Sequence, residues 1–333
     1  MAKPVQSPPD RLRRHVAVSK EEATLQFDRT VSRDLVHRRA IAEVFVTDSA
    51  PGPPGRTFVG VQIPRGHRMN RGSGRAAAVL VLEALRQASI YVAHTELSVP
   101  ADMVFVFSRM DLRFADAASL DFQGNQLSSM IDLSAELESL PNGRPRRMVF
   151  AARLIVDDQI LVEADGDVSL VTKEAWPLLR ARAGAELTDA DEPPSALPIS
   201  ESSIADVIRS PEDAGGHRFE ARVLVDDQHP FYFDHPLDHI PAALQVDALD
   251  ELCIHVLSRR ATSCEMFTLR SLRMDFRGFA ELSSPAFASV RIEDPSGTSG
   301  GDATTLIAEI RQGKSVVTMA TLEYALEQVS VDA

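Results

Sequence analysis

Hydrophobic and polar positions alternate in some parts of the chain and follow a helical period in others, and these changes predict an order of elements. Alternation over residues 42–46 and 57–63, interrupted by a Pro/Gly segment at 51–55, predicts two strands around a turn. The apolar segment at about 77–94 has good helix formers and neither Gly nor Pro, which predicts a long helix. Further strands are predicted at about 103–114, 128–138, 148–157 and 160–172, the last two separated by the turn-like Asp157-Asp158-Gln159.

The same order of elements returns in the second half of the chain. A second helix is predicted from about Ala242 to Leu257, and Leu80–Arg86 aligns with Leu244–Asp250 at an offset of 164 residues. Two further alignments, Leu112–Phe114 with Met274–Phe276 and His37–Asp48 with His217–Asp227, have offsets of 162 and about 180. Two copies of one unit indicate duplication. A long helix followed by antiparallel strands that would wrap around it is the hotdog pattern, so we predict an α+β tandem (double) hotdog.

The composition along the chain predicts where these copies begin and end. Residues 1–33 carry prolines and a basic cluster without a sustained apolar period, so we expect a flexible basic N-terminal arm. Residues 184–203 combine Gly, Pro, acidic residues and Ser, which predicts a linker. Hotdog domains are therefore expected at 34–183 and 204–333.

The overall composition narrows the class of function. With 44% hydrophobic and 25% charged residues, the 333-residue chain can bury a substantial core, so we expect a soluble globular protein. The net charge of −13 argues against nucleic-acid binding, because phosphate contacts require a basic face. No apolar stretch approaches the roughly 20 residues that cross a membrane. The two cysteines do not have the spacing of a disulfide framework or a zinc site, so a cytoplasmic protein is expected.

Glu83 is the first candidate for chemistry, because it interrupts an apolar helix between Leu82 and Ala84. Arg86 and Gln87 follow at i+3 and i+4 and share its helical face. One interpretation is an exposed polar stripe. The other is a carboxylate buried under the sheet, whose raised pKa would suit general acid or base catalysis. Arg86 could pair with this carboxylate or bind an anionic substrate group.

The approach to the second helix contains three histidines, His229, His235 and His239. The first two could brace a turn, or His235 and His239 could act in catalysis or substrate positioning. A metal site formed by His235, His239 and the acids of the following helix is conceivable, but we favour no metal. Because Pro241 precedes the helix, the N–H groups from Ala242 onward could polarise a thioester carbonyl.

Two sets of charged residues complete the candidates. On the second helix, Asp247, Asp250 and Glu251 occupy positions i, i+3 and i+4, where the first helix has Glu, Arg and Gln. Between residues 65 and 75, five basic side chains alternate with three glycines. This segment is either a solvated loop or a phosphate-binding loop. Its basic residues are Arg65, His67, Arg68, Arg71 and Arg75.

Three segments resemble the A-factor biosynthesis hotdog (AfsA-like) family. They are Val36–Arg39 with Ala42–Asp48, the helical run Leu82–Ala88, and the loop His235–Pro241. The resemblance covers roughly residues 33–175 and 204–326. It implies an acyltransferase of γ-butyrolactone or butenolide signal biosynthesis that transfers a β-ketoacyl group from acyl carrier protein to dihydroxyacetone phosphate.

The resemblance also implies roles for individual residues. Glu83 matches the family glutamate of the first half, and Arg86 and Gln87 match the residues that follow it. Asp247 stands where a second glutamate is expected, and Asp250 where an arginine is expected. In addition, Ala242 replaces a glycine. A shorter acid and a reversed charge predict a divergent member with one site altered or lost.

We therefore expect an enzyme that acts on an acyl thioester or acyl carrier protein and a phosphorylated three-carbon acceptor, without a cofactor and without membrane partners. A homodimer is compatible with this reading. The alternatives are a dehydratase, isomerase or thioesterase-like hotdog enzyme and a non-catalytic protein that binds an acyl ligand. The expected catalytic residues are Glu83, Asp247, His235 and His239, and the expected substrate-binding residues are Arg86, Gln87, Arg68, Arg71, Arg75, Ala242 and Asp250.

Overall fold

A computed structural model describes residues 24–71, 76–115, 120, 122, 124–184, 202–209, 217–259, 265–293 and 303–328. This part of the chain falls into two compact units that divide between Ala181 and Arg182. Residues 1–23 of the expected arm and 185–201 of the expected linker lie outside the described residues, as does Arg75.

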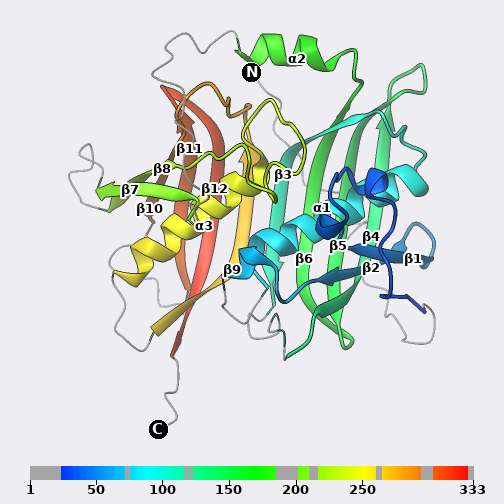
Figure 1. Cartoon of the computed structure of the whole chain (residues 1–333), viewed down its shortest axis with the longest axis horizontal. Coiled ribbons are helices and arrows are strands. Elements are labelled where there is room, and N and C mark those ends of the chain that lie inside the picture. Colours follow the sequence, from blue (N-terminus) through cyan, green and yellow to red (C-terminus); the bar gives the residue numbers. More distant parts are fainter. Residues whose placement is uncertain are drawn as a thin grey trace. The chain divides into compact units, whose positions relative to one another are not determined.

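Unit 1 is an antiparallel sheet with a long helix, α1 (Ala78–Thr95), lying across it (Figure 1). The strands are β1 (Val46–Pro51), β2 (Thr57–Ile63), β3 (Val104–Phe114), β4 (Leu127–Ser139), β5 (Pro145–Val156) and β6 (Gln159–Val171). They pair in the order β1-β2-β4-β5-β6-β3. The short 3-10 helices are η2 (Arg33–Val36), η3 (Ile41–Glu43) and η4 (Arg68–Asn70). A helix α2 (Trp176–Gly184) follows the sheet.

The core of unit 1 lies between α1 and the facing side of its sheet. Side chains alternate across a strand, so Leu133, Phe150 and Leu154 point toward the helix and are fully buried. A Cβ on Gly166 would stand 2.1 Å from the Phe150 ring, which explains the glycine at this position. Because α1 is buried on most of its surface, its polar residues are enclosed together with its apolar ones.

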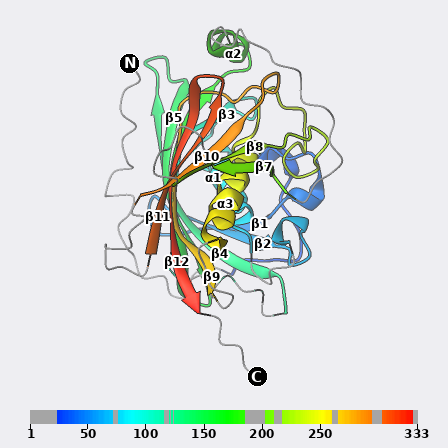
Figure 2. The same ribbon diagram turned by 90° about the vertical axis from the view of Figure 1, so that its left-hand side faces the viewer.

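Unit 2 repeats this arrangement around helix α3 (Ala242–Ser258). Its strands are β7 (Ile204–Arg209), β8 (Arg218–Val223), β9 (Glu265–Phe276), β10 (Phe287–Ile292), β11 (Ala303–Gln312) and β12 (Ser315–Gln328). They pair in the order β7-β8-β10-β11-β12-β9, which matches unit 1 strand for strand. Figure 2 shows α3 in the curve of its own sheet, between β7 and β12. The tandem hotdog prediction is confirmed.

Several local predictions are confirmed and others are wrong. The turn at Asp157 and Asp158 is a tight hairpin in which both residues have positive φ, 47° and 64°. The strand predicted over 42–46 is wrong, because η3 covers Ile41–Glu43 and β1 begins only at Val46. The alignment of His37–Asp48 with His217–Asp227 is also wrong, since β8 corresponds in the sheet order to β2. Helix α2 and strand β7 were not predicted.

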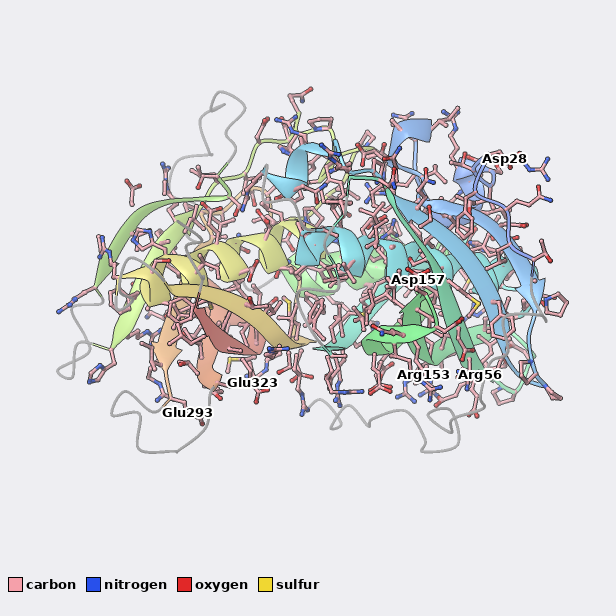
Figure 3. The ribbon with its side chains drawn as sticks, turned by 90° about the horizontal axis from the view of Figure 1, so that it is seen from below. Asp28, Arg56, Arg153, Asp157, Glu293 and Glu323 are labelled. Atoms are coloured by element: carbon pink, nitrogen blue, oxygen red, sulfur yellow. The ribbon has the colours of Figure 1, made fainter. Side chains whose placement is uncertain are left out.

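The outer face of the unit 1 sheet carries a set of ion pairs beside the buried Val149 and Ala151. Asp132 is fully buried and accepts hydrogen bonds from Nε and Nη2 of Arg56 at 2.6 and 2.5 Å. Arg153 lies 3.9 Å from the same carboxylate, and Figure 3 shows Arg56 and Arg153 side by side. These charges neutralise one another across the strands. Among the described residues, no helix has both the length and the apolar character needed to span a membrane.

Candidate active site

Glu83 lies in the second turn of α1 and is enclosed by basic and amide groups. Its carboxylate, 1% exposed, accepts hydrogen bonds from Arg86 Nε at 2.7 Å, Arg86 Nη2 at 2.8 Å and Gln87 Nε2 at 2.6 Å. Arg38, which follows η2, donates from Nε at 2.9 Å and brings Nη2 to 2.7 Å. The expected grouping of Glu83, Arg86 and Gln87 is therefore present. Arg38 is a fourth member that helical spacing could not reveal.

The expected direction of the Glu83 pKa is wrong. Burial by itself raises the pKa, but the charges of Arg38 and Arg86 and the hydrogen bonds from Arg86 and Gln87 outweigh it. The pKa falls from its usual 4.5 to about 2. Glu83 is therefore ionised at neutral pH, and a carboxylate of such low basicity is a weak proton acceptor.

The same cluster fastens the start of unit 1 to the helix. Gln87 donates from Nε2 to the Glu43 carbonyl at 2.7 Å and accepts from the Phe45 N–H at 2.8 Å. Arg86 donates to the Val36 carbonyl at 3.3 Å. These bonds explain the failed strand prediction, because the Phe45 N–H is taken by a helix side chain instead of a neighbouring strand.

Asp247 occupies the position in α3 that corresponds to Glu83 and is 5% exposed. Its Oδ2 accepts a hydrogen bond from the Tyr232 hydroxyl at 2.7 Å. His229 holds the turn that carries this tyrosine, because its Nδ1 accepts from the N–H groups of Phe231 and Tyr232, both at 3.3 Å. The His229 and Tyr232 rings stack with centroids 4.3 Å apart. Sequence reasoning placed Asp247 here but missed Tyr232.

The other two acids of α3 have partners of their own. Asp250 accepts from the Tyr324 hydroxyl at 2.5 Å, and burial is the main cause that raises the pKa of Tyr324 well above its usual range. Glu251 accepts from the Ser203 N–H at 2.8 Å and from the Ser202 hydroxyl. Asp250 is therefore accommodated by a phenol at the position where the family expects an arginine.

His235 and His239 each lie beside the acid that precedes them. His235 Nδ1 is 3.5 Å from Asp234, and His239 Nδ1 is 2.7 Å from Asp238. Ala242 is the first residue of α3, directly after Pro241. Among the described residues, no group of three or more His, Cys, Asp or Glu side chains could hold a metal ion.

The described part of the 65–75 segment presents three arginines to solvent, and Arg65 among them donates from Nη1 to the Gly124 carbonyl at 2.7 Å. Arg68 opens η4, and Arg71 follows it in the left-handed conformation with φ 47°. Both are exposed. The Asn70 Oδ1 accepts from the Ala77 N–H at 3.1 Å, which fixes this segment to the start of α1.

Comparisons with known proteins agree with this architecture. The family model described as "A-factor biosynthesis hotdog domain" matches residues 19–172 and 201–326. A Streptomyces virginiae protein named 2-oxo-3-(phosphooxy)propyl 3-oxoalkanoate synthase is 26% identical over 270 residues, covering 78% of this chain and 86% of that protein. Among solved structures, one described as an oleoyl thioesterase from Lactobacillus plantarum superposes with a TM-score of 0.51 at 12% identity. It covers 82% of this chain and 96% of its own. This last likeness concerns the fold alone.

Proposed function

The chain belongs to the A-factor biosynthesis hotdog family, and we propose that it transfers a β-ketoacyl group from a thioester to dihydroxyacetone phosphate in γ-butyrolactone or butenolide signal biosynthesis. The name of the Streptomyces virginiae relative describes an ester of a 3-oxoalkanoate with a phosphorylated 2-oxopropyl group. That ester is the product of the proposed transfer. Acyl carrier protein is the proposed donor, since its thioester is the activated form of such a chain.

The reaction requires one proton to be moved twice. The acceptor hydroxyl gives its proton to a base as its oxygen bonds to the thioester carbon, and the carbon–sulfur bond then breaks as the sulfur takes that proton from the base and leaves as a thiol. We propose that Asp247 is the base that accepts this proton and that Tyr232 orients its carboxylate. The observation that carries the assignment is the difference between the partners: Asp247 accepts from a neutral phenol, whereas Glu83 accepts from two guanidinium groups.

The remaining candidates are proposed to bind or position the substrate. Arg68 and Arg71 are exposed cations of the kind that a phosphorylated acceptor needs, and the side chain of Arg86 is 21% exposed beside Glu83. In unit 2, the N–H of Ala242 lies at the positive end of the α3 dipole, where a developing oxyanion is stabilised. His235 and His239, on the approach to α3, are candidates for positioning the substrate.

The proposal is tested by following both substrates at once. Purified protein is incubated with a β-ketoacyl carrier protein, or its N-acetylcysteamine thioester, and dihydroxyacetone phosphate, and the products are resolved by mass spectrometry. We expect the phosphorylated ester, and a thioester that persists when the acceptor is left out. Hydrolysis or dehydration at the same rate without acceptor would contradict acyl transfer and favour a thioesterase or dehydratase.

A variant of Asp247 tests whether this residue accepts the proton. Asp247→Asn keeps an oxygen that can accept from Tyr232 but removes the base, so we expect kcat to fall by about 10²- to 10⁴-fold. Asp226→Asn is the matched control, because Asp226 lies in the same unit and bonds to the Gln228 N–H. Equal activity of the two variants would show that Asp247 does not take the proton.

A further inference from the structure

Two histidines of unit 1 face each other at the end of α1. His94 is in the last turn of the helix, and His37 follows η2. Their Nε2 atoms are 3.0 Å apart, and the ring centroids are 5.1 Å apart with planes inclined at 40°. Phe105 packs its ring edge-on against both. Both histidines are half-buried, so the pair is in contact with solvent.

The hydrogen bonding of His94 fixes which of its nitrogens carries a proton. Its Nδ1 is 2.8 Å from the Val99 carbonyl, and a carbonyl only accepts, so Nδ1 is the protonated nitrogen. In the neutral ring the lone pair is then on Nε2, which points at His37. Metal-binding histidines commonly have this arrangement, with one nitrogen donating to a backbone carbonyl and the other bound to the ion.

The separation of the two nitrogens is close to that of a shared metal ion. Zinc–imidazole bonds of about 2.0–2.1 Å at a tetrahedral angle place two nitrogens about 3.3 Å apart. The observed 3.0 Å reaches this value by a small rotation of either side chain.

The surrounding backbone also favours a cation at this point. The last turn of α1 is the negative end of the helix dipole, which stabilises a positive charge beside His94. His37 has φ 54°, in the left-handed region where a non-glycine residue is uncommon. This conformation ends η2 and places the imidazole opposite His94.

We propose that His37 and His94 bind one divalent transition-metal ion, Zn²⁺, Ni²⁺ or Cu²⁺, with water completing the coordination. The site lies outside the residues assigned to acyl transfer and does not rest on the proposed function. Imidazole nitrogens suit these ions. With two protein ligands, the site binds in a readily reversible way, and the affinity depends on both histidines.

The experiment measures binding of the metal alone to the untagged full-length chain. Isothermal calorimetry with Zn²⁺ gives affinity and stoichiometry, and electron paramagnetic resonance with Cu²⁺ counts the bound nitrogens. His37→Gln and His94→Gln are compared with His255→Gln, a matched control because His255 is a half-buried histidine in the last turn of α3. Circular dichroism establishes that each variant is folded.

We expect wild type and His255→Gln to bind one ion with equal affinity and a two-nitrogen Cu²⁺ spectrum. Each of the other variants should weaken this binding at least about tenfold, because loss of a ligand costs no less than loss of an outer-shell partner. Two outcomes would overturn the proposal: equal affinity in all four proteins, or no binding by folded wild type. Either would leave the pair as two imidazoles that share a proton.

Discussion

Helices α1 and α3 place a carboxylate at the same position, and the two carboxylates have different partners. Glu83 is held by Arg38, Arg86 and Gln87, while Asp247 accepts from the Tyr232 hydroxyl. Two guanidinium groups stabilise the charged form of Glu83 strongly enough to lower its pKa to about 2. Duplication has therefore kept the position of the acid, while the neighbouring side chains decide what the acid can do.

The residues three and four positions after each acid also differ between the two helices, but only one of the two changes removes an interaction. Arg86 is replaced by Asp250, which bonds to Tyr324 instead of to the neighbouring carboxylate. Gln87 is replaced by Glu251, yet both side chains accept a hydrogen bond from a backbone N–H just before the first strand of their unit. The donor is Phe45 in unit 1 and Ser203 in unit 2. This fastening role has therefore survived the duplication, whereas the ion pair at i+3 has not.

Removing the charge of Glu83 should have the largest effect on stability. Glu83→Ala leaves two guanidinium groups without their buried counter-ion, and we expect a loss of about 3–5 kcal/mol in the free energy of unfolding. Urea unfolding followed by circular dichroism measures it. Glu96→Ala, at the exposed end of α1, is the control and should change little. A loss below about 1 kcal/mol for Glu83→Ala would mean that the cluster contributes little to the stability of the fold.

Lowering the pH should remove the stabilisation that ionised Glu83 provides, without a mutation. Because the folded pKa of Glu83 is depressed from 4.5 to about 2, its contribution is fully present above pH 4.5 and is lost as the pH falls toward 2. The shift corresponds to stability on the order of 3 kcal/mol. The difference in unfolding free energy between wild type and Glu83→Gln should narrow over this range. A difference that stays constant down to pH 2 would contradict the ionised cluster.

Tyr232→Phe should have a smaller effect on stability, and it tests the hydrogen bond to Asp247. The variant removes one hydrogen bond to a buried carboxylate, which is worth about 1.5–3 kcal/mol. If Tyr232 orients Asp247 for catalysis, kcat should fall about tenfold or more while KM changes little. Tyr324→Phe, which removes the phenol beside Asp250, is the matched control. Equal losses of kcat in both variants would show a general effect of losing a buried phenol.

The fold was predictable from the sequence because its longest elements have strong periodic patterns. The predicted helices and the strands β3–β6 agree closely with the observed bounds. Short elements were not predictable in this way. At Ala42–Val46, alternating apolar residues suggested a strand, but all of Val44, Phe45 and Val46 are buried and the chain there is held by Gln87.

The candidate site was predictable only where its members are close in sequence. Arg86 and Gln87 lie on the helical face of Glu83, so spacing alone brought them together. Arg38 is 45 residues from Glu83, and Tyr232 is 15 residues from Asp247 across a turn. Such pairings depend on tertiary contacts. The direction of the Glu83 pKa was wrong for the same reason, since the missing partner was a buried cation.

The division of roles between the two carboxylates is tested most directly by the pH profile of kcat/KM for Glu83→Gln and Asp247→Asn, measured where each variant is folded. If Asp247 takes the proton, Glu83→Gln keeps the acid limb of the wild-type profile at a scaled rate, and Asp247→Asn loses it. Loss of the acid limb in Glu83→Gln, with the limb retained in Asp247→Asn, would contradict this division of roles.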